Sequence, residues 1–142
     1  MEKTREEHLR EQIRRCSHKF SNGKILVNTC PHDITFVDGD EVVNIPFSKE
    51  LLVNATTTEI RLGEDLVETN PEGNPEGEEL IALIQDEIDD PKLRIIGSVM
   101  AADAYANVVG MTPMPGFERV PPAEKRMSIE KFNSGHRHPD WA

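Results

Sequence analysis

The sequence predicts a single α+β domain over residues 1–142: a small antiparallel β-sheet with an N-terminal amphipathic helix, two further short helices and an extended, proline-rich C-terminal tail. Three observations indicate this fold. Apolar residues recur at helical spacing near the N-terminus, short β-rich runs separated by turn residues follow, and prolines interrupt residues 113–142. The length of 142 residues is typical of one domain.

The N-terminal segment, 1–20, is expected to be helical over 3–19. Glutamates precede arginines along it, an order that suits both i,i+4 pairing and the helix dipole. Four residues form its apolar face: Leu9, Ile13, Cys16 and Phe20. A helix with one apolar face has to pack against the domain or against a partner chain.

Residues 24–69 are predicted to be rich in β-strands. Strand-forming runs on either side of Asp38-Gly39-Asp40 are a strong hairpin signal. The expected strands cover 24–28, 32–37, 41–45, 51–62 and 65–69. The tandem Asn-Pro-Glu-Gly of residues 70–77 is predicted to be a surface loop, because proline and glycine oppose the continuation of both helix and strand.

Residues 78–112 are predicted to mix helix and strand. The expected order is a helix over 78–88, a buried strand over 93–96, an alanine-rich helix over 99–106 and a last strand over 108–111. Residues 113–142 are predicted to be extended and irregular. Their apolar side chains indicate a tail laid down on the body or on a neighbour, with its end, 135–142, frayed.

Charge is distributed unevenly along the chain. Residues 1–32 carry a net charge of +3, residues 33–90 carry −15 and residues 91–142 carry +2. The acidic middle disfavours any long nucleic-acid footprint and any anionic membrane surface. With no apolar run near the roughly 20 residues that span a bilayer and no signal-peptide pattern, a cytoplasmic location is the simplest expectation.

Two Cys-x-His pairs, Cys16 with His18 and Cys30 with His32, contain residue types that bind zinc, but their spacing is not a usual zinc pattern. Cys30 and His32 also offer a thiol and a base, without an evident third group to orient them. Paired acids lie in turns and helix ends, where they are common for structural reasons. The sequence therefore predicts no catalytic residue, no metal, no cofactor and no enzyme.

The basic part of the tail is the strongest candidate for ligand binding. Arg119 and Arg126 lie in a stretch that prolines hold extended without strand pairing, which leaves long cations available to a ligand. Arginine binds phosphate in a bidentate manner, and Phe117 offers a ring on which a base can stack. The alternative is that these charges are solvated or paired with the acidic middle of the chain.

Two segments resemble a family of small phage and prophage proteins. One is Asn28-Thr29-Cys30-Pro31-His32-Asp33-Ile34. The other begins with Ile96-Gly97-Ser98 and Ala101-Ala102, and continues as Pro115-Gly116-Phe117-Glu118-Arg119-Val120-Pro121-Pro122, Lys125-Arg126-Met127 and Lys131-Phe132. In these residues the chain resembles the phage Thoeris anti-defence sponge family, whose members sequester the cyclic ADP-ribose signal of host TIR enzymes without cleaving it, and some of which also hold cyclic nucleotides at a second site.

The resemblance implies a non-catalytic protein of the host cytoplasm that counters antiviral defence. It implies one compact anionic cyclic nucleotide-type ligand and a homo-oligomer with pockets at subunit interfaces. Residue by residue, it implies Arg119 and Arg126 as phosphate contacts and Phe117 as a stacking ring. Asn28 and His32 would contact the base or the ribose.

Two other functions remain compatible with the sequence. One is an acidic interaction protein that blocks a host factor through its negative face, residues 59–90, in the manner of a nucleic-acid mimic. The other is an unrecognised enzyme or zinc protein built on the Cys-x-His pairs.

Overall fold

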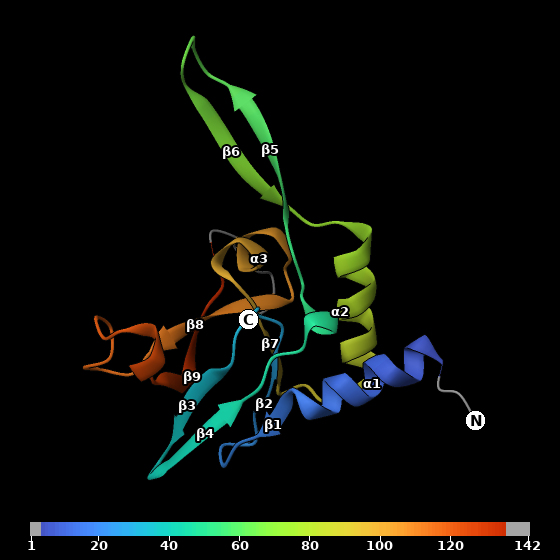
Figure 1. The fold of residues 1–142 in the computed structure, drawn as a ribbon, viewed down its shortest axis with the longest axis vertical. Helices are drawn as coiled ribbons and strands as arrows, with labels where there is room; N and C mark the ends of the chain where they lie inside the picture. Colours follow the sequence, from blue (N-terminus) through green and yellow to red (C-terminus); the bar gives the residue numbers. More distant parts are fainter. Residues whose placement is uncertain (1–3, 136–142) are drawn as a thin grey trace.

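The structure is a computed structural model that describes residues 4–135, and it confirms the α+β class (Figure 1). The helices are α1 (Arg5–Arg15), α2 (Pro75–Glu87) and α3 (Val99–Ala104), with two 3-10 turns, η1 (Lys49–Leu51) and η2 (Pro122–Glu124). The strands are β1 (Ser17–Lys19), β2 (Ile25–Asn28), β3 (Ile34–Asp38), β4 (Glu41–Ile45), β5 (Thr56–Arg61), β6 (Val67–Glu72), β7 (Leu93–Ile96), β8 (Val108–Pro113) and β9 (Met127–Asn133).

The main sheet has seven strands in the order β1-β2-β7-β8-β9-β3-β4 and is mixed, whereas the sequence predicted an antiparallel sheet. The pairs β2/β7, β7/β8 and β3/β9 are parallel. Parallel neighbours need a crossover connection, and α3 supplies one between β7 and β8. The remaining strands, β5 and β6, form a separate antiparallel hairpin that projects from the body (Figure 1).

Two hydrophobic clusters lie on opposite faces of the strands β2, β7 and β8. Alternate residues of a strand point to opposite faces. Val27, Ile95 and Val108 therefore join the cluster under the helices, whereas their neighbours Leu26, Ile96 and Val109 join the cluster under β3, β4 and β9. Both faces of the central strands are thus buried, which fixes their carboxyl ends in place.

The N-terminal helix docks on its own domain, one of the two outcomes expected for an amphipathic helix. Ile13 is fully buried in the cluster that it shares with α2 residues. The Thr4 hydroxyl caps the helix by accepting a hydrogen bond from the Glu7 N–H at 3.1 Å. The helix ends at Arg15 rather than at residue 19, because Ser17–Lys19 leaves it to pair with β2 as strand β1.

The tandem Asn-Pro-Glu-Gly is not a loop, and that prediction was wrong. Asn70-Pro71-Glu72 forms the end of β6, where proline is tolerated on an edge strand. Asn74 caps α2, and its side chain accepts a hydrogen bond from the Gly77 N–H at 2.8 Å. Pro75 occupies the first turn of the helix, where its missing N–H costs nothing. The helix therefore starts three residues earlier than residue 78.

The predicted irregular tail contains an interior strand of the sheet. Residues 127–133 form β9, which pairs with β8 on one side and with β3 on the other. Residues 127–133 contain no proline, and Ile129 is buried against the second cluster. In the described part of the predicted tail, Pro115, Pro121 and Pro122 lie in residues 114–126, between β8 and β9. The frayed end expected at 135–142 lies almost wholly outside the described residues.

Candidate ligand-binding site

The carboxyl ends of β2 and β7 lie side by side because the two strands are parallel, with Asn28 opposite Ile96. The chain leaves β2 through Thr29, whose N–H and hydroxyl both donate to the Ile96 carbonyl, at 2.9 and 2.7 Å. It leaves β7 through Gly97, where a Cβ would lie 2.5 Å from Val108 Cγ1. In open α/β sheets this edge, beyond the carboxyl ends of the strands, is where ligands bind.

Asn28 is 1% exposed and holds the loop after β2 in place. Its amide nitrogen donates to the carbonyls of His32, Ile45 and Pro46 at 2.9, 3.2 and 3.3 Å. Its side-chain oxygen accepts from the Cys30 N–H at 2.8 Å. These bonds occupy both the nitrogen and the oxygen of the Asn28 amide. Asn28 therefore fixes the backbone of the loop that carries His32.

Two adjoining cavities form a crevice above this loop, and they share His32, Met111 and Met127. One, of about 470 Å³, is also lined by Asp33, Ile34, Thr35, Pro122, Ala123 and Lys125. The other, of about 370 Å³, is also lined by Cys30, Pro31, Gly97, Ser98, Val99, Ala102, Gly110, Asn133 and Gly135. Their walls are mostly apolar with a few convergent polar groups, which is the usual character of a small-molecule site.

His32 and Lys125 supply polar groups on the rim of the larger cavity. The His32 side chain is exposed, with Nδ1 3.0 Å from the Asp33 carbonyl. The Lys125 ammonium donates to the Glu118 carbonyl at 2.6 Å, which leaves two of its hydrogens for a ligand. The neighbouring Asp33 carboxylate accepts from the Phe47 N–H at 3.1 Å and ties the loop to the segment after β4.

The loop of residues 114–126 borders the crevice through Pro122, Ala123 and Lys125. The Met114 N–H donates to the Arg126 carbonyl at 2.8 Å and closes the base of the loop. Figure 1 shows this orange segment standing out from the ends of β8 and β9. The crevice therefore has one wall made of irregular backbone, which lies beside the sheet rather than on it.

The structure brings only one of the five predicted site residues, His32, to the crevice wall. Arg119 is exposed on the loop, and its side chain makes no hydrogen bond or ion pair within residues 4–135. Arg126 is half-buried and donates to the carbonyl of Lys125 at 3.1 Å. Phe117 is half-buried in the same loop, where its N–H donates to Met114. None of these three lines either cavity.

Lys125 is the crevice residue that sequence reasoning passed over. It lies in the basic stretch of the tail that drew attention to Arg119 and Arg126. The sequence could not separate the three cations, because the short turn η2, which precedes Lys125 and brings it to the cavity, is not signalled by periodicity. Both cavities also share two methionines: Met111 carried no functional signal, and Met127 appeared only within a segment quoted for the resemblance.

The Cys-x-His pairs do not form a metal cluster in the part of the chain that the structure describes. Both cysteines are free and buried. Burial raises the pKa of the Cys30 thiol to about 11, and burial is also the main reason that the pKa of Cys16 is raised. Cys30 therefore stays protonated at neutral pH, a poor state for a nucleophile or a metal ligand.

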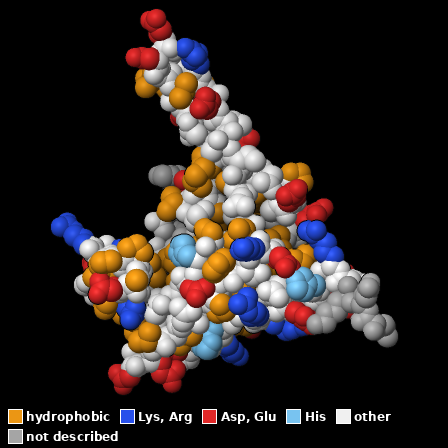
Figure 2. All heavy atoms as spheres, in the orientation of Figure 1, with side chains coloured by type: hydrophobic (Ala, Val, Ile, Leu, Met, Phe, Trp, Pro, Cys, Tyr) orange, Lys and Arg blue, Asp and Glu red, His pale blue; other side chains and the backbone are white. Residues whose placement is uncertain are grey.

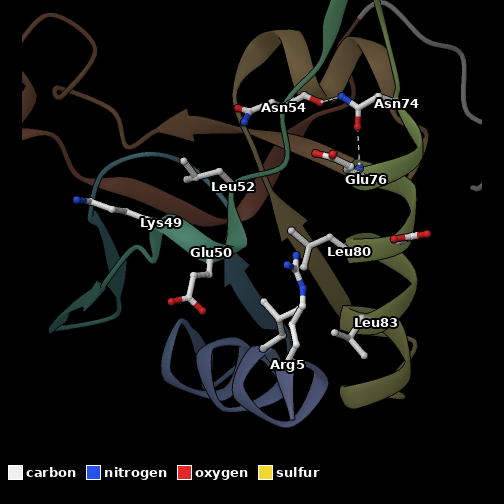
Figure 3. Close-up of a pocket in the computed structure, with 12 residues that line it drawn as sticks. Arg5, Lys49, Glu50, Leu52, Asn54, Asn74, Glu76, Leu80 and Leu83 are labelled. Carbon is white, nitrogen blue, oxygen red and sulfur yellow. Dashed lines mark hydrogen bonds between the residues drawn. The ribbon is translucent and has the colours of Figure 1, made fainter. Parts of the chain in front are cut away.

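A larger hollow of about 800 Å³ lies between α1, the segment after η1 and α2 (Figure 3). Leu52, Leu80 and Leu83 point into it (Figure 3). Its charged lining is mixed: Arg5 and Lys49 against Glu50, Glu76 and Glu79. This lining offers no concentrated positive charge, so the hollow suits an anion less well than the crevice does.

Comparison with known proteins gave no matching family model, no matching curated protein and no matching solved structure. In residues 4–135, none of the helices has the length and apolar character that crossing a membrane requires. Function is therefore inferred from the geometry of the site and the chemistry of its residues.

Proposed function

We propose that this protein binds one small nucleotide-type ligand in the crevice at the carboxyl ends of β2 and β7 and holds it without cleaving it. The observation that carries the proposal is the pair of adjoining, mostly apolar cavities around His32, Met111 and Met127. Apolar walls accept the faces of a base and a ribose. The Lys125 ammonium on the rim offers a charge for a phosphate group.

The ligand class follows from the size and charge of the site together with the resemblance described above. A cyclic ADP-ribose isomer is compact and anionic: the apolar walls suit its base and ribose, and Lys125 offers one cation for its phosphates, in a cavity that the Asp33 carboxylate also lines. In this proposal the protein acts in the host cytoplasm during infection and removes an immune signal of this kind. It acts by mass action, since every bound molecule is withheld from its receptor.

The described residues support binding rather than chemistry. The Cys30 thiol is held protonated by burial. The His32 Nδ1 atom lies 3.0 Å from the Asp33 carbonyl, so this ring nitrogen is engaged by a backbone group. The Asp33 carboxylate beside it is engaged by the Phe47 N–H. The proposal therefore assigns no catalytic role to these groups.

Titration calorimetry with cyclic ADP-ribose isomers tests the proposal. Lys125→Met keeps most of the apolar stem and removes the charge, and we expect it to weaken binding about tenfold or more, equal to about 1.4 kcal/mol. Arg119→Ala is expected to weaken binding by a smaller factor, because the loop of residues 114–126 borders the crevice without placing Arg119 in its wall.

Lys131→Met is the matched control. Lys131 is exposed on β9 and lines neither cavity, so its loss should leave the affinity within about twofold. A wild-type protein that binds none of the isomers would refute the proposal. Equal losses for Lys125→Met and Lys131→Met would indicate a general charge effect instead of a site.

The acidic interaction protein remains the second candidate, because acidic residues line both the projecting hairpin and α2 (Figure 2). It predicts a host protein that binds wild type and is lost on charge reversal within residues 59–90. Under that hypothesis Lys125→Met has no effect. The two proposals therefore differ in which variant abolishes function.

A further inference from the structure

The β5–β6 hairpin is the part of the described chain least supported by its own domain. Every residue of β5 is exposed. Of the seven large hydrophobic residues exposed within residues 4–135, four lie at or near its tip: Ile60 (51%), Leu62 (59%), Leu66 (59%) and Val67 (43%). Figure 2 shows hydrophobic side chains beside acidic ones near the end of the arm. An isolated two-stranded hairpin is at best marginally stable in water, so we expect the β5–β6 hairpin, or arm, to pack against a partner.

The base of the hairpin is nevertheless held firmly. The Tyr105 hydroxyl donates to the Asn54 carbonyl at 2.8 Å and accepts from the Asn74 N–H at 2.9 Å. The Asn74 side chain also donates to the Asn54 carbonyl at 3.0 Å (Figure 3). One buried tyrosine thus joins the segments entering and leaving the arm. The hairpin is presented to solvent in a fixed direction.

The outer edge of β5 is open for strand pairing. The Leu62 N–H donates to the Leu66 carbonyl across the hairpin. Since alternate residues of a strand point their backbone groups in opposite directions, Ile60 and Thr58 face β6, whereas Glu59 and Arg61 point theirs outward. β5 contains no proline, whereas β6 contains Pro71 and packs its base against α3. The edge that remains available is that of β5.

The charged residues on the outer edge of β5, Glu59 and Arg61, can pair with the same residues of a second copy. If two copies of β5 pair antiparallel about a two-fold axis at Ile60, Glu59 lies opposite Arg61 of the partner subunit, and Arg61 lies opposite Glu59 of the partner subunit. Moving the axis to residue 59 sets glutamate against glutamate, and moving it to residue 61 sets arginine against arginine. Opposite charges stabilise such cross-strand pairs and like charges destabilise them, which selects the register centred on Ile60.

We propose that the outer edge of β5 is a homodimer interface, through which two copies of this chain join their hairpins into one four-stranded antiparallel sheet centred on Ile60. The two Ile60 side chains meet on one face of that sheet, and two Glu59–Arg61 ion pairs form on the other. Arg61 keeps the bond that it donates to the Glu64 carbonyl, because a guanidinium carries five donors.

The charge pairing is tested on the full chain by light-scattering mass measurement after gel filtration. Wild type is expected to have the mass of a dimer. Glu59→Arg and Arg61→Glu are each expected to be monomers alone, because each sets like charges opposite one another. Mixed in equal amounts, the two variants should form a heterodimer, in which every arginine faces a glutamate. Wild type that stays monomeric at high concentration overturns the proposal, as does a mixture that remains monomeric.

The register is tested with a single cysteine. In the proposed register the two copies of Ile60 lie opposite each other as a non-hydrogen-bonded pair. Their Cα atoms are then about 4.5 Å apart, within the range of a disulfide. Ile60→Cys should therefore crosslink to a covalent dimer on mild oxidation, whereas the native cysteines, both buried, should not. Val42→Cys is the matched control, because Val42 is 59% exposed on the edge strand β4. Equal crosslinking of both variants would contradict the register.

Discussion

Asn28 occupies the last position of a buried strand, where an apolar residue would be the usual choice. Its amide donates to the carbonyls of His32, Ile45 and Pro46 and accepts from the Cys30 N–H, so it joins the loop after β2 to the end of β4. A buried polar side chain is costly unless it is bonded in this way. The shape of the crevice therefore depends on the buried Asn28 amide, which holds the loop carrying His32.

Asn28→Ala is predicted to destabilise the protein by about 1–3 kcal/mol, because the Cys30 N–H and its neighbouring carbonyls lose their partner in a buried place. Urea unfolding measures the effect. Asn44→Ala is the control: Asn44 is exposed, its amide donates to Thr35 at 3.2 Å, and its loss should cost less than about 0.5 kcal/mol. Comparable losses for both variants would contradict the positioning role of Asn28.

The candidate residues show what the sequence could and could not predict at this scale. His32 was predicted from a resemblance in sequence and does line the crevice. Asn28 came from the same segment but is buried, because a polar residue at the end of a strand is equally suited to a ligand and to a loop. Lys125 was passed over, since only the fold shows which of the neighbouring cations turns toward a cavity.

Helix α2 begins where the sequence predicted a loop. The close approach of Tyr105 explains why position 77 of this helix holds a glycine. A Cβ on Gly77 would lie 2.6 Å from Tyr105 Cζ and would overlap the hydroxyl. Tyr105 needs this space to reach Asn54 and Asn74. The glycine therefore serves a packing contact between α2 and the end of α3, rather than a turn.

Gly77→Ala is predicted to destabilise the protein by about 1–3 kcal/mol through overpacking. This sign is opposite to the gain of about 1 kcal/mol that the same change usually gives inside a helix. Gly63→Ala is the control, since its nearest neighbour would be 3.9 Å away. Thermal unfolding of the two variants decides the matter, and a Gly77→Ala protein as stable as wild type would show that Tyr105 can move freely.

The contact between α1 and α2 is reinforced by ion pairs. Glu87 accepts from Arg10 at 3.2 Å and from Arg14 at 3.0 Å. These hydrogen bonds hold the pKa of the Glu87 carboxyl below its usual value of 4.5, and the bond from Arg14 has the larger effect. Arg10 also pairs with Glu6 and Asp86. Two arginines of α1 therefore reach across to acidic residues of α2.

Glu87→Gln is predicted to lower stability by roughly 0.5–1 kcal/mol at neutral pH. Because the folded pKa is depressed, the contribution of Glu87 is fully present above about pH 4.5 and is lost as the pH falls through the folded value. The difference between wild type and Glu87→Gln should therefore shrink below about pH 4.5. Denaturant unfolding at several pH values measures this stability difference. Glu79→Gln is the control, because Glu79 is exposed. A constant difference across this range would contradict the ion-pair explanation.

Elements defined by local signals were predicted well, and those defined by distant partners were not. The hairpin around Gly39 and the strand over 93–96 were predicted nearly residue for residue, because turn chemistry and short apolar runs are local. The parallel pairing of β2 with β7 joins segments more than sixty residues apart, and no local pattern encodes it. β9 was missed because the prolines before it made the whole tail look irregular.

At the scale of the whole molecule, the uneven charge of the sequence becomes a spatial arrangement. Much of the acidic middle of the chain lies on the projecting hairpin and on α2, away from the crevice (Figures 1 and 2). The basic stretch of the C-terminal region lies on the loop beside the crevice. Lys125 therefore offers an anion a cation at the crevice, whereas the acidic far end of the molecule repels it.

The binding proposal predicts a specific effect on stability as well. A ligand bound to the folded state alone raises the free energy of unfolding by about 2.7 kcal/mol at 100 times its dissociation constant. Wild type should therefore gain thermal stability with cyclic ADP-ribose, whereas Lys125→Met should gain less at the same concentration. Lys131→Met should behave as wild type. An equal gain in all three proteins would place the ligand outside the crevice.

Holding a ligand without cleaving it is the central claim, and release of the bound molecule tests it most directly. The protein is loaded with a cyclic ADP-ribose isomer, separated from free ligand, denatured by heat and the released molecule is weighed by mass spectrometry. The predicted result is recovery of the intact cyclic molecule from wild type, with much less recovered from Lys125→Met. Recovery of a linear hydrolysis product, or of no retained ligand from wild type, would contradict the claim.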